Sequence, residues 1–105
     1  MIHADFYQFK GKFREFKISG HAGYAESGKD VVCASVSSAV QLTVNMLDCF
    51  DCEPQVSADE NIICCSVKDG ETASMLIGQL LRHCRAILEE FPKTINITIR
   101  RCKYV

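Results

Sequence analysis

A histidine and a cysteine twelve residues apart have the spacing in this chain that most strongly suggests chemistry. Cys33 follows Asp30, a residue type that often caps a helix N-terminus. We therefore expect Cys33 in a first helical turn, where unpaired N–H groups and the macrodipole stabilise an anion such as a thiolate. His21 precedes this helix, and a neutral imidazole can accept a thiol proton. The pair predicts a cysteine nucleophile with a histidine base, while Asp30 either disfavours the thiolate or orients the imidazole.

The same two residues also have a structural interpretation. A cysteine in an apolar helix is most often a small buried hydrophobe, and a histidine in a loop is often solvated. The chain holds seven cysteines and three histidines, so some pairs fall close together by chance. Residue types and spacing therefore leave both interpretations open.

The surrounding sequence predicts a single α+β domain spanning residues 1–105, in the order ββαββαβ. Alternating apolar residues predict strands over Ile2–Lys10, Lys12–Ser19, Gln55–Ala58, Ile62–Lys68 and Thr94–Arg101. Apolar residues at spacings of three and four predict helices over Val31–Cys49 and from Asp69 to Pro92. The first helix has a predicted buried stripe of Val32, Val36, Ala39, Val40, Thr43, Val44 and Leu47. One sheet covered by both helices buries the two helical stripes most simply.

The residues around the pair resemble the bacterial ribosomal-processing cysteine proteases, the Prp family. The resemblance rests on chain length, element order and two motifs, Gly20-His21-Ala22-Gly23-Tyr24-Ala25 and Gly28-Lys29-Asp30-Val31-Val32-Cys33-Ala34-Ser35-Val36-Ser37. It implies that His21 and Cys33 form a catalytic dyad and that Ser37 supports it from one helical turn further on. Ser35 stands where a small residue such as glycine is expected and Ser27 where an aromatic residue is common, and both lie outside the dyad.

The resemblance also implies a function. Such enzymes remove an N-terminal extension from large-subunit ribosomal protein number twenty-seven, cleaving after an aromatic residue and before a small one. Cys33 would attack the carbonyl, His21 would protonate the leaving amine, and water would release the acyl peptide. The N–H groups of Cys33 and of the Gly20 region are candidate oxyanion donors by location. The family further implies a homodimer, and we expect neither a cofactor nor a metal.

The glycine-rich segment before Cys33 is expected to gate the site. Its glycines allow backbone conformations that are closed to other residues, so the segment can change shape at small cost. We expect residues 22–29 to cover the site in part and to open when a peptide binds. The alternative is a rigid turn. The gating residues are Ala22, Gly23, Tyr24, Glu26 and Gly28.

The motif Cys49-Phe50-Asp51-Cys52 is the alternative site, because a C-x-x-C pair can bind zinc or cycle as a redox pair. Cys64 and Cys65 could supply two more thiolates. Neighbouring residues of a strand face opposite sides, however, and the C-x-x-C lies at a helix end where the dipole opposes thiolates. We expect these cysteines to be structural.

Composition limits the remaining possibilities. The chain has 105 residues, 48% hydrophobic and 24% charged, with a net charge of -1, which disfavours a strongly basic nucleic-acid binder. The alternative function is a non-enzymatic ribosome-associated or RNA-binding adaptor, which would need clustered basic residues and exposed aromatics on a sheet. The N-terminus lacks a signal-peptide pattern, and the uncharged run from Val31 to Leu47 contains many polar residues. We therefore expect a cytoplasmic protein without a membrane partner.

Overall fold

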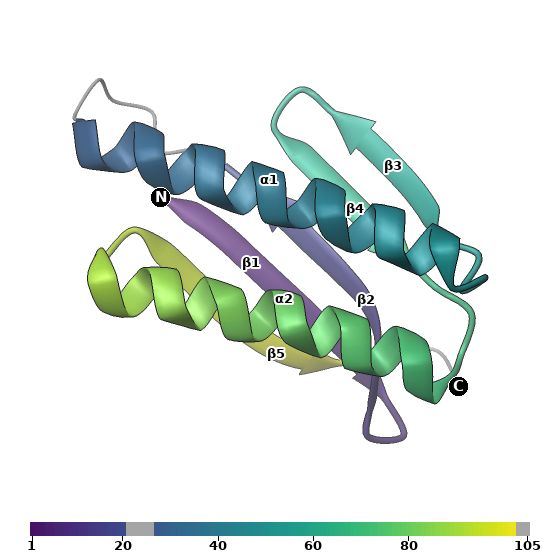
Figure 1. Ribbon diagram of the computed structural model, residues 1–105. Helices are drawn as coiled ribbons and strands as arrows, with labels where there is room; N and C mark the ends of the chain where they lie inside the picture. Colours follow the sequence, from purple (N-terminus) through teal and green to yellow (C-terminus); the bar gives the residue numbers. More distant parts are fainter. Residues whose placement is uncertain (21–26, 103–105) are drawn as a thin grey trace.

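One layer of sheet and one layer of helices make up the fold (Figure 1). The computed structural model describes residues 1–20 and 27–102, with residues 27–30 described by their backbone alone. In chain order the elements are β1 (Ile2–Phe9), β2 (Lys12–Ser19), α1 (Ser27–Cys49), β3 (Gln55–Asp59), β4 (Ile62–Ser66), α2 (Glu71–Glu90) and β5 (Ile95–Arg101). The predicted α+β class and the ββαββαβ order are confirmed.

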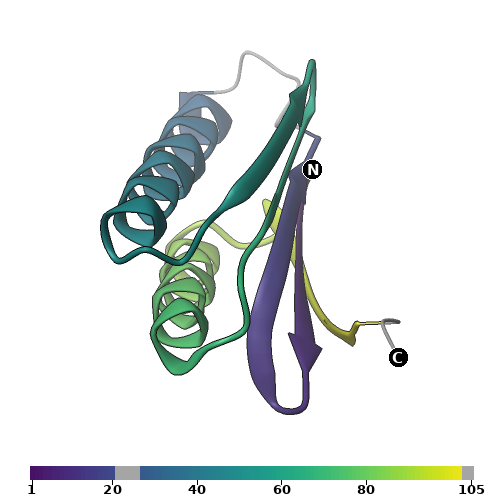
Figure 2. The same cartoon turned by 90° about the vertical axis from the view of Figure 1, so that its right-hand side faces the viewer.

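The five strands form one sheet in the order β3-β4-β2-β1-β5. All neighbours are antiparallel except β1 and β5, which are parallel. Each helix therefore joins two strands of the same direction, α1 from β2 to β3 and α2 from β4 to β5. The strands that precede the two helices, β2 and β4, run in opposite directions, and the two connections cross the sheet toward opposite edges. Two right-handed crossovers with this geometry lie on the same face of the sheet. Both helices indeed cover one face and leave the other open (Figure 2).

The predicted core is confirmed along the inner face of the sheet and the inner stripes of both helices. The stripe of α1 is buried at Val32, Val36, Val40, Thr43 and Leu47, while Ala39 and Val44 are partly buried. The stripe of α2 is buried at Ala73, Leu76, Ile77, Leu80, Leu81, Cys84 and Ile87. Beneath them lie Ile2, Ala4 and Phe6 of β1 and Phe16 and Ile18 of β2, all buried. Alternation in the strands and periodicity in the helices were thus sufficient to identify the core.

Turn geometry and local hydrogen bonds account for three of the strand ends that differ from the prediction. Lys10 and Gly11 both have positive φ, 52° and 81°, as a two-residue hairpin turn requires, so β1 ends at Phe9. The Thr94 hydroxyl donates to the carbonyl of Phe91 at 2.6 Å, which uses Thr94 in the turn before β5. Lys68 donates its backbone N–H to Cys52 at 3.0 Å and thereby leaves β4.

The start of α1 is the larger correction. The helix begins at Ser27, four residues before the predicted start at Val31, so Asp30 lies in its first turn and does not cap it. Gly28 and Lys29, which we expected in the loop, are helical. Glycine and a charged residue in a first turn weaken the periodic signal, because no apolar stripe marks these positions.

Helix α1 also has the length and composition of a membrane span. The segment Val31–Cys49 is apolar enough to cross a membrane by these two criteria, so its polar residues do not exclude a span as we had expected. In this fold its apolar stripe is buried from Val32 to Leu47 against the domain. Packing within the core accounts for the stripe without a membrane.

Candidate active site

Cys33 lies in the second turn of α1, one residue after the fully buried Val32. It is partly buried and packs against the hydrophobic core. The prediction that it lies in the first turn is wrong, because the helix begins six residues before it at Ser27. Since the macrodipole acts mainly within the first turn, the helix start stabilises a Cys33 thiolate less than we had expected.

Cys33 and Ser37 share one flank of α1. Residues four apart are neighbours on a helix surface, and the same flank continues to Gln41 and Val44. Ser37 is exposed, whereas Cys33 is half covered by its neighbours. At about 100° per residue, this flank lies to one side of the buried stripe. The predicted supporting serine is therefore on the same side of the helix as the candidate nucleophile.

Gly20 ends β2 in a conformation that suits glycine. Its φ is +75°, and a Cβ at this position would lie 2.6 Å from the carbonyl oxygen of Met1. Its N–H donates to the carbonyl of Asn61 at 3.0 Å, which ties the end of β2 to the β3–β4 turn. Gly20 thus fixes where the chain leaves the sheet on its way to α1.

Two of the candidate oxyanion donors, the N–H groups of Gly20 and Cys33, already have acceptors within the fold. The Gly20 N–H already donates to Asn61. The Cys33 N–H lies beyond the first four residues of α1, whose N–H groups are the ones left without an intrahelical acceptor. These two N–H groups are therefore occupied in this conformation. The N–H groups that follow Gly20 lie outside the described residues, so an oxyanion donor from that region stays a prediction.

His21 lies outside the described residues, as do Ala22, Gly23, Tyr24 and Glu26. The dyad and the gate therefore stay predictions. The part of the expected loop that is described, residues 27–29, is helical. Asp30 is described by its backbone alone, one turn before Cys33.

Burial separates the other cysteines into two groups. Burial raises the pKa of Cys65 and of Cys84 to about 11, with the Glu15 carboxylate adding to the effect at Cys65. Desolvation also raises the pKa of Cys52 and of Cys102. Thiols of this kind react slowly because the thiolate is the nucleophile. Cys49, by contrast, is exposed.

The C-x-x-C motif closes the end of α1. Cys49 is the last residue of the helix, and Cys52 donates its backbone N–H to Leu47 at 2.9 Å. Cys52 is buried while Cys49 is exposed, so their surroundings differ. Within residues 1–20 and 27–102, no three His, Cys, Asp or Glu side chains are grouped as a metal site would need. These contacts fit the structural role expected from the sequence.

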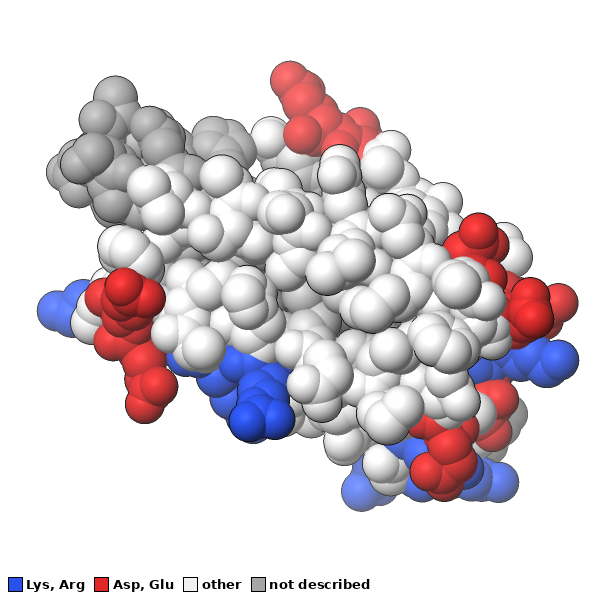
Figure 3. Space-filling view, viewed as in Figure 1, with Lys and Arg blue, Asp and Glu red and all other residues white. Residues whose placement is uncertain are grey.

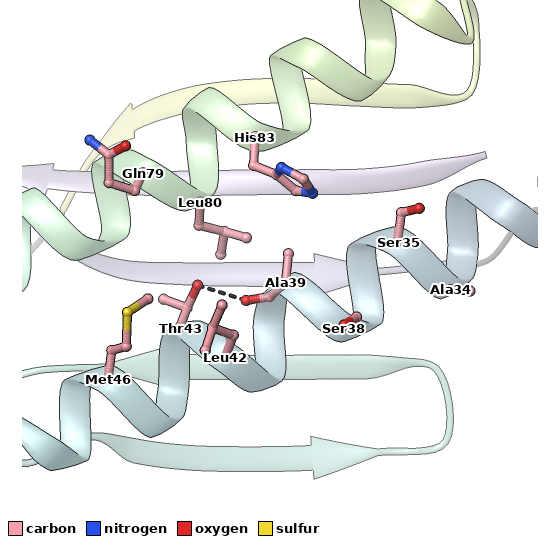
Figure 4. Close-up of a pocket in the computed structure, with 10 residues that line it drawn as sticks. All are labelled: Ala34, Ser35, Ser38, Ala39, Leu42, Thr43, Met46, Gln79, Leu80 and His83. Carbon is pink, nitrogen blue, oxygen red and sulfur yellow. Dashed lines mark hydrogen bonds between the residues drawn. The ribbon is translucent and has the colours of Figure 1, made fainter.

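A hollow lies on the other flank of α1. It has a volume of about 590 Å³ between the two helices. Figure 4 shows its lining residues, with the His83 ring turned from α2 toward α1. They are Ala34, Ser35, Ser38, Ala39, Leu42, Thr43, Met46, Gln79, Leu80 and His83. Sequence patterns did not predict this hollow; the one signal of it in the sequence is the uncharged run from Val31 to Leu47 in α1.

The open face of the sheet carries both acidic and basic side chains. Alternation along the central strands places His3, Asp5 and Tyr7 of β1 on this face, paired with Ser19, Lys17 and Glu15 of β2. Stacking of bases needs several aromatic rings and basic neighbours. On β1 and β2 two carboxylates lie beside one lysine and one tyrosine, and Tyr7 also pairs with Arg100 of β5, so this part of the face is mixed in charge. The adaptor alternative stays a prediction that these residues do not favour.

Comparison with known proteins identifies the kind of enzyme. The family described as cysteine protease Prp matches residues 1–96. No curated protein is significantly similar to the chain. The crystal structure of SMU.848 from Streptococcus mutans is 28% identical with a TM-score of 0.86, over 97% of this chain and 96% of that chain.

Two structures of the essential ribosomal processing protease Prp from S. aureus are also similar. The complex with a covalently linked product peptide is 25% identical with a TM-score of 0.83, over 94% of this chain and 99% of that chain. The complex with a substrate peptide, 24% identical with a TM-score of 0.84 over the same shares, supports the fold alone. Since the family match covers nearly the whole chain, this chain belongs to the Prp family of cysteine proteases.

Proposed function

We propose that this cysteine protease removes the N-terminal extension of large-subunit ribosomal protein number twenty-seven. The main support is the S. aureus relative, a ribosomal processing protease whose structure holds a covalently linked product peptide. A covalent product is what a cysteine nucleophile forms during acyl transfer. In this chain Cys33 is the cysteine that matches the family motif, and it is partly accessible on one flank of α1.

The proposed reaction has two steps. The Cys33 sulfur attacks the scissile carbonyl, a thioester forms, the C–N bond breaks, and His21 gives the thiol proton to the leaving amine. Water then attacks the thioester, His21 accepts a water proton, and the thiol returns with the acyl peptide released as an acid. Because Cys33 lies beyond the first turn of α1, activation of the thiol depends more on His21 than on the helix dipole.

A synthetic precursor peptide tests the reaction. The peptide carries an aromatic residue before the scissile bond and a small residue after it. We expect wild-type enzyme to give the two products expected from this bond, and a matched Cys49→Ala variant to do the same. Products from another bond, or none, would contradict the proposed substrate.

We further propose that the protease acts as a homodimer through the outer face of its two helices. Charged residues lie mainly at the rim of this face (Figure 3). Leu42 and Met75 are 58% and 61% exposed on it, and apolar side chains at such exposure favour an interface. A twofold contact juxtaposes the same residues, so an uncharged face avoids repulsion.

Light scattering tests the dimer directly. We expect twice the chain mass for wild type and the chain mass for Leu42→Lys combined with Met75→Lys. A wild-type monomer would contradict the proposal. The matched variant Ser57→Lys, on the open face of the sheet, should stay dimeric.

A cytoplasmic site of action and the absence of a direct nucleic-acid contact also belong to the proposal. The net charge of -1 supports the latter, because binding to phosphates requires an excess of basic residues.

A further inference from the structure

A second hollow lies beside the flank of α1 that carries Cys33. Its volume is about 290 Å³, and it is lined by Gln41, Val44 and Asn45 of α1, Val56 of β3 and Ile63 of β4. None of the five carries a charge. The hollow is separate from the larger one between the two helices.

Its floor is apolar and its rim is polar. Val56 pairs with the buried Cys65, which places both on the helix side of the sheet, yet Val56 remains 45% exposed. Val44 and Ile63 are partly buried and pack against the core. Gln41 and Asn45 are exposed one turn apart, and each amide can both donate and accept hydrogen bonds. This arrangement suits an apolar side chain held by a polar backbone.

The hollow is aligned with Cys33 along the helix. Cys33, Ser37, Gln41 and Val44 follow one another at spacings of four, four and three on one flank of α1. The β3–β4 hairpin lies beside α1, and β3 is the edge strand of the sheet (Figure 1). A chain bound at Cys33 can therefore continue along this flank, between helix and hairpin.

The separation defines how far such a chain must reach. Eleven residues of helix separate Cys33 from Val44, or about 16 Å at 1.5 Å per residue. An extended peptide advances about 3.3 Å per residue, so it covers this separation in about five residues.

We propose that this hollow is a remote substrate subsite that binds an apolar side chain about five residues from the scissile bond. The proposal rests on the proposed protease function, and it adds a second determinant to the residues at the cleaved bond. Gln41 and Asn45 hold the peptide backbone, and Val44, Val56 and Ile63 hold the side chain. An extended precursor then binds more tightly than a short peptide with the same scissile bond.

Kinetics with two synthetic peptides test the subsite. Both carry the same scissile bond between an aromatic and a small residue. The short peptide extends about three residues from this bond on each side. The long peptide continues past the fifth residue from the bond and has a leucine at that fifth position. For wild type we expect kcat/KM roughly tenfold higher with the long peptide, as a filled apolar pocket gives. Val56→Asp should remove this advantage by raising KM and should leave cleavage of the short peptide unchanged.

Ser57→Asp is the matched control, since it adds the same charge one residue along β3 on the opposite face. It should keep the long-peptide advantage. The double variant Gln41→Ala, Asn45→Ala changes two exposed helical positions and should lower the advantage even if Val56→Asp fails to fold. A long-peptide advantage that survives both subsite variants would overturn the subsite.

An aspartate scan of the long peptide uses the wild-type enzyme alone. Aspartate at the residues of the scissile bond should lower kcat/KM. We expect a second, separate loss of kcat/KM when aspartate stands about five residues from the bond, on one side. Equal cleavage of long and short peptides would overturn the subsite and leave the protease proposal standing. Failure to cleave either peptide would overturn the proposed substrate, and the subsite with it.

Discussion

The two flanks of α1 are built from similar residues but lie against different neighbours. One flank carries Cys33 and Ser37 and continues to Gln41 and Val44, which lie beside the β3–β4 hairpin. The other flank carries Ser35, Ser38 and Leu42 and lies beside α2. The larger hollow is on the second flank, whereas Cys33, the proposed nucleophile, is on the first. Under the proposed function, the catalytic side of this helix is therefore the side of the Cys33 thiol and not the side of the larger hollow.

A buried stripe keeps the flanks apart. Val32, Val36, Val40 and Leu47 are at most 3% exposed, so the helix cannot rotate about its axis without exposing them. Burial of such side chains stabilises a fold by about 1.5–3 kcal/mol each. The core thus fixes which flank Cys33 occupies, and the proposed chemistry depends on that orientation.

Removal of the Cys33 sulfur should have the largest effect. In Cys33→Ala we expect no detectable cleavage of the precursor peptide and a native circular dichroism spectrum, because alanine favours helix and the site is only partly buried. Ser35→Ala, on the opposite flank, should retain wild-type cleavage. Cleavage by Cys33→Ala would transfer the chemistry to another group.

Removal of the His21 imidazole should come next. We expect His21→Ala to lower kcat by on the order of a hundredfold or more, which is the usual effect of losing positioned proton transfer. Circular dichroism checks the fold, and His3→Ala on β1 is the control. Turnover near that of wild type at all pH values would assign proton transfer to a different residue.

Thiol labelling compares the Cys33 flank with the buried interior. With limiting iodoacetamide at pH 8, we expect Cys33 to react at least tenfold faster than Cys65 or Cys84. Their pKa of about 11 leaves on the order of one thiol in a thousand ionised at that pH. Because the pKa values of Cys65 and Cys84 are both raised, these thiols stay protonated until the pH approaches 11. Their protection from alkylation should weaken only near that pH. Fast labelling of either at pH 8 would mean that the core opens.

Two adjacent serines give the finest comparison. Ser37→Ala should lower kcat about fivefold, the effect of losing one hydrogen bond near the nucleophile. Ser38→Ala, one residue further on the opposite flank, should leave kcat unchanged. Equal effects of the two substitutions, measured with the same peptide, would remove the distinction between the flanks.

Sequence patterns predicted most of the fold because the core follows simple periods. The alternation of Ile2, Ala4 and Phe6 and the three-and-four spacing from Val32 to Leu47 correspond directly to buried faces. The start of α1 was missed because Gly28 and Lys29 have no apolar period, and Asp30 looked like a cap.

The site was predicted less completely. Cys33 and Ser37 do share a flank, because helix geometry fixes that relation. The two hollows depend on how α1 packs against β3, β4 and α2, which are distant in sequence. Pairing of Val56 with Cys65, and of the Gly20 N–H with Asn61, cannot be read from local spacing.

Trapping the acyl-enzyme is the most direct test of the claim that Cys33 is the nucleophile. The precursor peptide is mixed with enzyme, quenched in acid and analysed by mass spectrometry. No Lys or Arg lies between Lys29 and Lys68, so trypsin leaves Cys33 and Cys49 on one peptide, and fragmentation must locate the adduct. We predict the acyl product on Cys33 in both wild type and Cys49→Ser. An adduct on Cys49 or Cys52, or turnover without any adduct on Cys33 under conditions that trap thioesters, would contradict the account.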